Sequence, residues 1–259
     1  MCLIFAALKR HPRYKLIIAA NRDEFYDRKT AAAGFWPDYP DILGGRDLEA
    51  GGTWLAVNKY GKIGMVTNFR DPKNINPAAP SRGALVTNYL LSPTTPFDYL
   101  EKVRIAGLRY NGFNLLIGGP DELAYFSNYG EGVTGLKEGV YGLSNHLLET
   151  PWPKVKRGKE QLLGLLERGL VNESSLFELL YDDLVAPDDL LPDTGIGLER
   201  ERALSSMFIK TSGYGTRCST VILVDYDNQV RFSERIFNLQ TFDHETRDFS
   251  FQIVNPALV

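Results

Sequence analysis

A thiol at position 2 and a polar cluster at positions 21–24 are the residues of this 259-residue chain best suited to chemistry. Cysteine attacks a carbonyl carbon as the thiolate, and its free pKa of about 8.5 leaves most of it protonated at neutral pH. A neighbouring cation or base activates it. The cluster Asn21, Arg22, Asp23, Glu24 supplies one guanidinium and two carboxylates. If the fold brings it to Cys2, the pattern predicts a nucleophilic cysteine with charged partners.

The intervening residues predict a β-hairpin that makes this contact. Residues 1–8 and 14–20 are almost entirely apolar, and a polar turn containing Pro12 separates them, which is typical of paired strands. In an antiparallel pair the start of the first strand lies beside the end of the second. We therefore expect Cys2 to lie beside the cluster. From these residues alone, an ordinary buried cysteine next to a solvated loop stays an alternative.

Removal of Met1 would place the amino group of Cys2 beside its own thiol. An α-amine has a pKa of about 8 and can act as the base for an adjacent nucleophile. One residue then supplies both nucleophile and base. Either Asp23 or Glu24 could hold this amine or pair with Arg22, and the residues leave that choice open.

The composition indicates an ordinary globular protein of the reduced cytosol. The chain is 44% hydrophobic and 24% charged, with a formal net charge of −3, which argues against a nucleic-acid partner. Its two cysteines form no metal-binding spacing and cannot build a disulfide framework. We expect one domain over residues 1–259, a cytoplasmic location, no transmembrane segment, and neither cofactor nor metal. The oligomeric state is not predicted.

The order of predicted elements indicates an α+β fold. Hairpins separated by pairs of helices favour antiparallel sheets with helices on their outer faces, and two such sheets face to face form a four-layer αββα sandwich. Residues 25–52 are expected to be an irregular loop. The predicted strands are 1–8, 14–20, 53–58, 62–69, 113–118, 123–128, 140–145, 207–209, 218–224 and 230–235, and the predicted helices are 84–91, 96–106, 155–170 and 173–184.

Further candidate residues follow predicted strands. Asn68 and Asn145 could donate their side-chain amides to an oxyanion, or could be ordinary turn residues. Arg217 could point a cation into the same pocket, or form a cross-strand salt bridge. Of the three histidines, only His146 falls near the proposed site, and a lone histidine is weak support for haem ligation.

Five separated motifs resemble the transport and Golgi organisation protein 2 family, also called the NRDE family. The chain is more distantly similar to N-terminal-nucleophile hydrolases of the choloylglycine hydrolase and penicillin V acylase type. Those enzymes begin Met-Cys and carry residues matching Arg22, Asn68 and Asn145, but they space the arginine and an aspartate three residues apart. The family motifs are Cys2, the tetrapeptide 21–24, Gly-Thr-Trp at 52–54, Gly-Leu-Ser-Asn at 142–145 and Thr-Arg-Cys-Ser-Thr-Val at 216–221.

The resemblance implies an αββα fold in which the cysteine attacks an amide and asparagine side chains stabilise the oxyanion. The leading hypothesis is an amidohydrolase or acylase acting on a linear amide or acyl bond. The alternative is a non-catalytic carrier of haem, acyl-CoA or lipid in the same pocket, because eukaryotic members are associated with haem mobilisation and acyl-lipid metabolism. The candidate catalytic residues are Cys2, Arg22, Asp23, Asn68 and Asn145, and the candidate binding residues are Asn21, Glu24, Trp54, Arg217 and His146.

Overall fold

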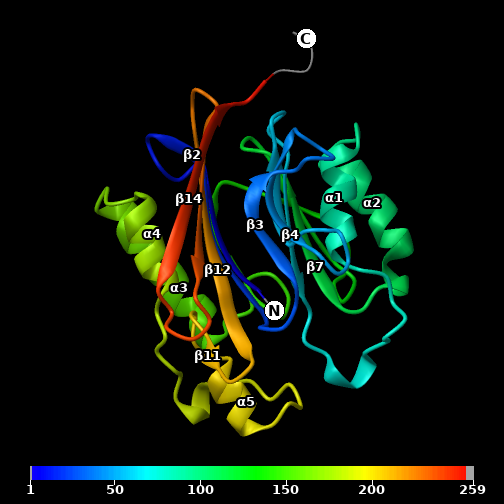
Figure 1. The fold of residues 1–259 in the computed structure, drawn as a ribbon, viewed down its shortest axis with the longest axis vertical. Coiled ribbons are helices and arrows are strands. Elements are labelled where there is room, and N and C mark those ends of the chain that lie inside the picture. The colour runs from blue at the N-terminus through cyan, green and yellow to red at the C-terminus, as the bar shows by residue number, and fades with distance from the viewer. Residues whose placement is uncertain (1, 255–259) are drawn as a thin grey trace.

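A computed structural model describes residues 2–254 and contains two seven-stranded antiparallel sheets (Figure 1). The first sheet has the strand order β10-β1-β2-β12-β13-β14, with β11 paired to β12, and the second runs β3 to β9 in sequence order. The strands of the first sheet are β1 (Cys2–Leu8), β2 (Tyr14–Phe25), β10 (Gly139–Leu143), β11 (Lys210–Thr211), β12 (Tyr214–Asp225), β13 (Gln229–Phe237) and β14 (His244–Gln252). Those of the second are β3 (Thr30–Phe35), β4 (Ile42–Asp47), β5 (Leu55–Asn58), β6 (Ile63–Asn68), β7 (Phe113–Gly118), β8 (Leu123–Ser127) and β9 (Thr134–Leu136).

Two pairs of helices cover the outer faces of the two sheets, which confirms the predicted αββα sandwich (Figure 1). One apolar core lies between the sheets, a second under α3 and α4, and a third under α1 and α2. The helices are α1 (Gly83–Leu91), α2 (Pro96–Ala106), α3 (Pro153–Glu167), α4 (Glu173–Leu180) and α5 (Leu198–Ala203), with 3-10 turns at Pro72–Asn74, Gly107–Arg109 and Asp188–Leu190. Within residues 2–254, no helix combines the length and the apolarity needed to cross a membrane.

Alternation along the first hairpin determines where the polar end of β2 points. Successive side chains of a strand lie on opposite faces. Ile4 and Ile18 pack between the sheets, whereas Phe5 and Ile17 pack under α3 and α4. The same period continues into the tetrapeptide, so adjacent residues there face different layers of the sandwich.

A glycine allows α3 to lie close to β1. A Cβ placed on Gly158 would come within 2.0 Å of the Phe5 ring, so no other residue fits without moving the helix. Phe5 and Val155 belong to the same buried cluster. This contact holds the first turn of α3 over the start of the hairpin.

Most predicted elements are confirmed. The first hairpin pairs as expected, and Thr95 caps α2 by accepting a hydrogen bond from the Asp98 amide, with Pro96 at the first helical position. The prediction of a loop over 25–52 is wrong, because β3 and β4 lie there. Their glycine and alanine content hid the strand pattern.

Helix α5 was also not predicted, and further errors concern short or polar strands. Residues 207–209 are buried but form no strand, and the ladder begins instead at β11 and β12. Strand β14 was not predicted, because most of its side chains are exposed and polar and only Phe249 and Phe251 pack against the core. It nevertheless pairs along its whole length with β13.

Candidate active site

Cys2, Arg22 and Cys218 lie side by side on three neighbouring strands. Cys2 of β1 pairs with Arg22 of β2, and Arg22 pairs with Cys218 of β12 on its other side. The ladder between β1 and β10 ends at Ile4 and Leu143. Continuing that antiparallel register by two residues brings Asn145 opposite Cys2. The predicted meeting of the thiol and the tetrapeptide is therefore present in the fold.

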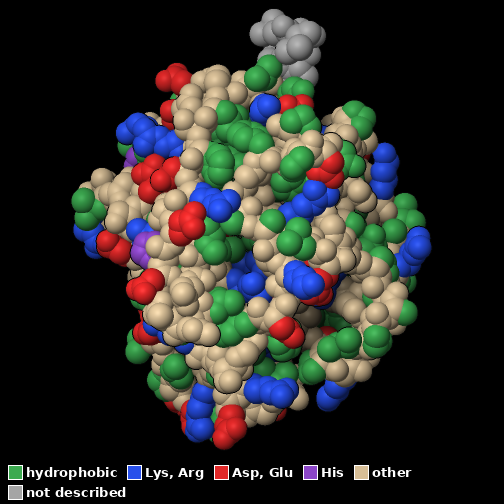
Figure 2. Space-filling view, in the orientation of Figure 1, with side chains coloured by type: hydrophobic (Ala, Val, Ile, Leu, Met, Phe, Trp, Pro, Cys, Tyr) green, Lys and Arg blue, Asp and Glu red, His purple; other side chains and the backbone are tan. Residues whose placement is uncertain are grey.

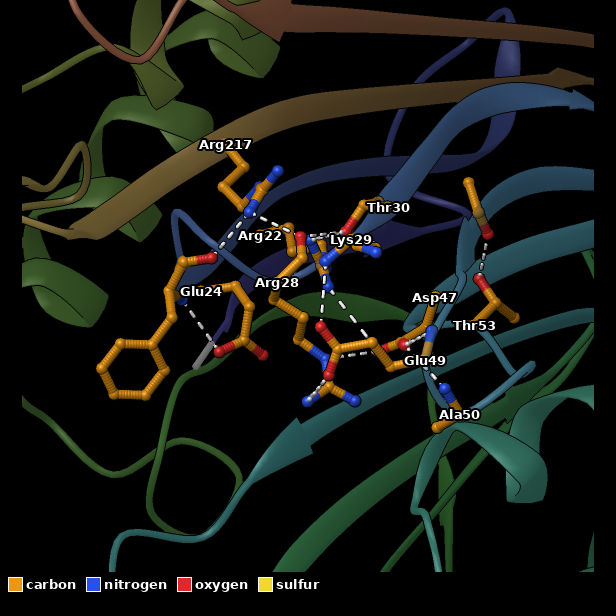
Figure 3. Close-up of polar contacts among 12 residues, drawn as sticks. Arg22, Glu24, Arg28, Lys29, Thr30, Asp47, Glu49, Ala50, Thr53 and Arg217 are labelled. Carbon is orange, nitrogen blue, oxygen red and sulfur yellow. Dashed lines mark hydrogen bonds and ion pairs between the residues drawn. The ribbon is translucent and has the colours of Figure 1, made fainter.

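The Arg22 side chain extends between the sheets and is 4% exposed. Its guanidinium stacks on the Trp54 ring at 4.1 Å from the centroid. It also donates a 3.0 Å hydrogen bond to the Thr30 hydroxyl (Figure 3). One Asp47 carboxylate oxygen lies 3.9 Å away. Strands of the opposite sheet therefore hold this guanidinium on the Cys2 face of β2.

Arg217 and Arg28 organise the turn that follows β2 (Figure 3). The Arg217 guanidinium donates to three main-chain oxygens, those of Phe25, Tyr26 and Arg28, at 2.6 to 2.9 Å. Arg28 donates to Asp47 at 2.7 Å. These three bonds of Arg217 all go to backbone, and its predicted role in the pocket stays a prediction. Glu24 accepts from the main-chain amide of Phe25 at 2.9 Å.

Asp23 points in the opposite direction from Arg22, towards the helix layer. Its side chain is fully buried and accepts a 2.7 Å hydrogen bond from the Thr216 hydroxyl. Burial raises the pKa of the Asp23 carboxyl, and the Lys154 ammonium acts against this rise. Between the two carboxylates of the tetrapeptide, Asp23 is the one enclosed by protein.

Asn21 occupies the same face of β2 as Asp23, and its polar groups bind the protein itself. Its side-chain amide donates to the carbonyl oxygens of Leu180 and Met207 at 2.8 and 2.9 Å, and its oxygen accepts from the Ser219 hydroxyl. These bonds attach the end of α4 and the chain at Met207 to β2. Its predicted role in ligand binding stays a prediction.

The Asn145 side chain contacts the main chain of Asn68, and the predicted role of both residues at an oxyanion stays a prediction. The fully buried Asn145 side chain donates to the Asn68 carbonyl at 3.1 Å, and the Asn145 carbonyl accepts from the Arg70 amide at 2.7 Å. One of the two amide hydrogens of Asn145 is thereby used. His146 follows, with Nδ1 2.9 Å from the Thr150 hydroxyl and its ring against Phe69.

The surroundings of Cys2 favour the neutral form of its thiol. Burial raises the pKa of Cys2 above its usual value, the Asp23 and Glu24 carboxylates raise it further, and Arg22 lowers it. Met1, whose removal would free the amine of Cys2, lies outside the described residues. A thiol with a raised pKa needs a base before it can attack.

Cationic side chains surround the centre. Figure 2 shows a hollow near the middle of this face with Lys and Arg side chains in and around it. A cavity of about 60 Å³ lies beside Arg22, and Trp54, Arg217, Cys218 and Glu234 help to line it. Arg82, before α1, is coupled electrostatically to Glu24 and Cys2. Among residues 2–254, no group of three His, Cys, Asp or Glu side chains is arranged to hold a metal ion.

Four charged residues near the centre were not anticipated from the sequence. They come from distant segments: Arg70 follows β6, Arg82 precedes α1, Lys154 lies in the first turn of α3, and Glu201 lies in α5. Arg70 and Glu201 form a buried ion pair of 2.7 Å. The only available signal was weak: Arg70 lies two residues after Asn68, whereas Lys154 lies nine residues after Asn145.

Comparison with known proteins agrees with the motifs that these elements bring together. Residues 1–239 match the family model described as Transport and Golgi organisation 2. The chain belongs to this family. A Transport and Golgi organization protein 2 homolog of Homo sapiens is 39% identical over 275 residues, covering 98% of this chain and 99% of the relative. Transport and Golgi organization protein 2 of Drosophila melanogaster is 31% identical, covering 90% and 91%.

The fold of this Transport and Golgi organisation 2 member is similar to that of N-terminal-nucleophile hydrolases. The N-acylethanolamine-hydrolyzing acid amidase ortholog of Caenorhabditis elegans superposes with a TM-score of 0.50 at 11% identity, over 86% of this chain and 92% of that one. At this identity the similarity concerns the fold alone.

Proposed function

We propose that this protein is an N-terminal cysteine hydrolase that cleaves a linear amide or acyl bond of a small molecule. The observation that carries the proposal is the pairing of Cys2 with Arg22 on adjacent strands, with Asn145 two residues past the end of β10 on the other side of β1. A nucleophile, an amide donor and a guanidinium therefore lie at one end of the sandwich, and the buried Asp23 lies on the opposite face of β2. A structural relative named as an acid amidase has the same fold.

In this proposal Met1 is removed and the freed amine of Cys2 takes the proton from the thiol. Sulfur attacks the carbonyl carbon, and the side-chain amides of Asn68 and Asn145 stabilise the developing oxyanion. The amine returns its proton to the leaving group, which departs as a thioester forms. Water then cleaves the thioester and releases the acid, regenerating thiol and amine. Asp23 holds the amine, and Arg22 stabilises negative charge beside the thiol.

Hydrolysis of a panel of acyl p-nitroanilides and p-nitrophenyl esters tests this role. Intact mass first establishes whether Met1 is absent. For each substrate that responds, Cys2→Ala is expected to lower kcat by a factor of about a thousand or more, because the attacking atom is lost. Undiminished hydrolysis by Cys2→Ala would refute the proposal.

A second candidate is favoured by the cations around a neutral thiol. Arg22, Arg82 and Arg217 surround the centre, and the raised pKa of Cys2 suits a site that binds without reacting. A carrier of haem, acyl-CoA or lipid would use these cations for a carboxylate or phosphate. Equilibrium binding of these ligands should then survive Cys2→Ser but be lost in Arg22→Ala. A parallel loss in both variants, with turnover in the wild type, favours the hydrolase.

A cytoplasmic location and a single domain over residues 1–259 belong to the same proposal. Cys2 and Cys218 are both free thiols in the structure, which suits a reducing compartment. Cell fractionation with an antibody to the chain tests the location. Limited proteolysis tests the domain, and one protected fragment containing both sheets is the expected result.

A further inference from the structure

Lys154 is a buried cation that the mechanism above does not use. It lies in the first turn of α3 and is 1% exposed, and its ammonium nitrogen has no hydrogen-bond partner among residues 2–254. Two effects oppose a charge there. Burial removes its hydration, and the positive end of the α3 dipole repels it. A charge kept in such a place requires a nearby anion.

The strongest compensation comes from Asp23 on β2. Among the charged neighbours of Lys154, Asp23 has the strongest effect on its pKa, followed by Arg70, Cys2 and Glu201. The effect is mutual, because Lys154 is the strongest of the groups that keep the Asp23 pKa down against burial. The close approach of α3 to β1 at Gly158 holds Lys154 in this position. Four elements therefore contribute one titratable group each around this ammonium: β2, the segment after β6, β1 and α5.

We propose that Lys154 is a positioning residue of the Cys2 centre, and that its ammonium is the counter-cation which keeps Asp23 ionised behind the thiol. An ionised Asp23 can accept a hydrogen bond from the amine of Cys2. The adjacent Lys154 charge disfavours a second ammonium, so that the amine stays a free base. The role in orienting this amine rests on the proposed function, whereas the pairing of Lys154 with Asp23 does not depend on catalysis.

A double-mutant cycle measures the pairing without any substrate. Urea unfolding at pH 7 compares the wild type with Lys154→Met, Asp23→Asn and the double variant. If the charges pair, the unfolding constant of the double variant departs from additivity by about tenfold or more. Additivity within about twofold would overturn the pairing. Lys156→Met is the matched control, since Lys156 is an exposed lysine of the same helix, and should show no coupling to Asp23→Asn.

The action of Lys154 on Cys2 has a separate readout. The rate of Cys2 alkylation by iodoacetamide is measured as a function of pH by peptide mass spectrometry. This rate reports the fraction of Cys2 that is present as the thiolate. Losing the cation should move the midpoint of this profile upward by about one pH unit in Lys154→Met. Lys154→Arg should restore it, and Lys156→Met should not move it. A Lys154→Met profile that superimposes on the wild type refutes the action on Cys2, whatever Cys2→Ala does to hydrolysis.

Discussion

Arg22 and Asp23 are neighbours in the sequence, but they belong to two different environments. The Arg22 side of β2 faces the second sheet, and its outer partners reach the surface: Arg28 is 32% exposed and Asp47 is 15% exposed. On the Asp23 side, Asp23, Lys154 and Glu201 are all at most 4% exposed. Solvent and ligands can therefore exchange contacts on the first side. On the Asp23 side, neighbouring protein groups alone determine which side chains are ionised. The two sides should therefore respond differently to substitution, pH and salt.

The largest effect is expected on the enclosed side, in Glu201→Ala. This change removes the carboxylate that contacts Arg70 at 2.7 Å and accepts from the Thr194 amide and hydroxyl. Breaking a buried ion pair from one side costs about 3–5 kcal/mol of unfolding free energy. Urea unfolding measures this cost. Glu199→Ala, at an exposed position of the same helix, should change stability by less than about 0.5 kcal/mol, and an equal loss in both variants would contradict the comparison.

Lys154 should give the enclosed side a distinctive dependence on pH. Burial lowers its pKa to about 8 from an ordinary value of 10.5. Between these values the unfolded chain binds more protons at this site, so the free energy of unfolding rises with pH there. The difference between these two pKa values corresponds to about 3 kcal/mol of unfolding free energy, and below pH 8 the folded protein lacks all of it.

The pH dependence is measured as a difference between two proteins. Urea unfolding from pH 7 to 10.5 compares the wild type with Lys154→Met, so that other titrating groups largely cancel. The wild type should gain stability relative to the variant as pH rises through 8. Curves that stay parallel would mean that Lys154 does not titrate in this window.

On the side that faces the second sheet, Arg22→Met should cost about 2 kcal/mol. It removes the hydrogen bond to Thr30 and the stack on Trp54, but the methionine still fills part of the space. Thermal and urea unfolding measure the loss. Arg13→Met is the control, because Arg13 lies over the Tyr14 ring at an exposed position and should cost less than about 0.5 kcal/mol.

The sequence predicted one of these sides better than the other. Cys2 and Arg22 belong to one hairpin, where strand pairing alone brings positions 2 and 22 together. The sequence left open whether Asp23 or Glu24 meets the amine, and the structure shows Asp23 buried on the other face of β2 from Arg22. The partner of Asp23, Lys154, lies 131 positions further along the chain, and a lysine in a helix normally indicates a solvated face. Nothing in its neighbours reveals that this turn is buried.

The errors in the fold have the same physical origin. Strands β3 and β14 are stable because neighbouring strands pair with them, and their own residues lack a clear apolar period. Where a segment carries its own signal, as in the Thr95-Pro96 start of α2, its boundary was predicted closely. Local patterns therefore identified the core hairpins and caps, while elements and charges that depend on distant partners required the structure.

The smallest effect, and the one that separates the two environments most directly, is expected in Arg28→Gln. Arg28 pairs with Asp47 at 2.7 Å and approaches Glu49 at 3.5 Å, but it is one-third exposed. Screened surface pairs of this kind contribute less than about 1 kcal/mol. The loss should shrink further in 1 M NaCl, where the Debye length is about 3 Å. The cost of Glu201→Ala should change little with salt, because water and ions do not reach that pair. If the two variants are equally sensitive to salt in urea unfolding, both sides are open to solvent. The claim that neighbouring protein charges keep Asp23 ionised would then lose its basis.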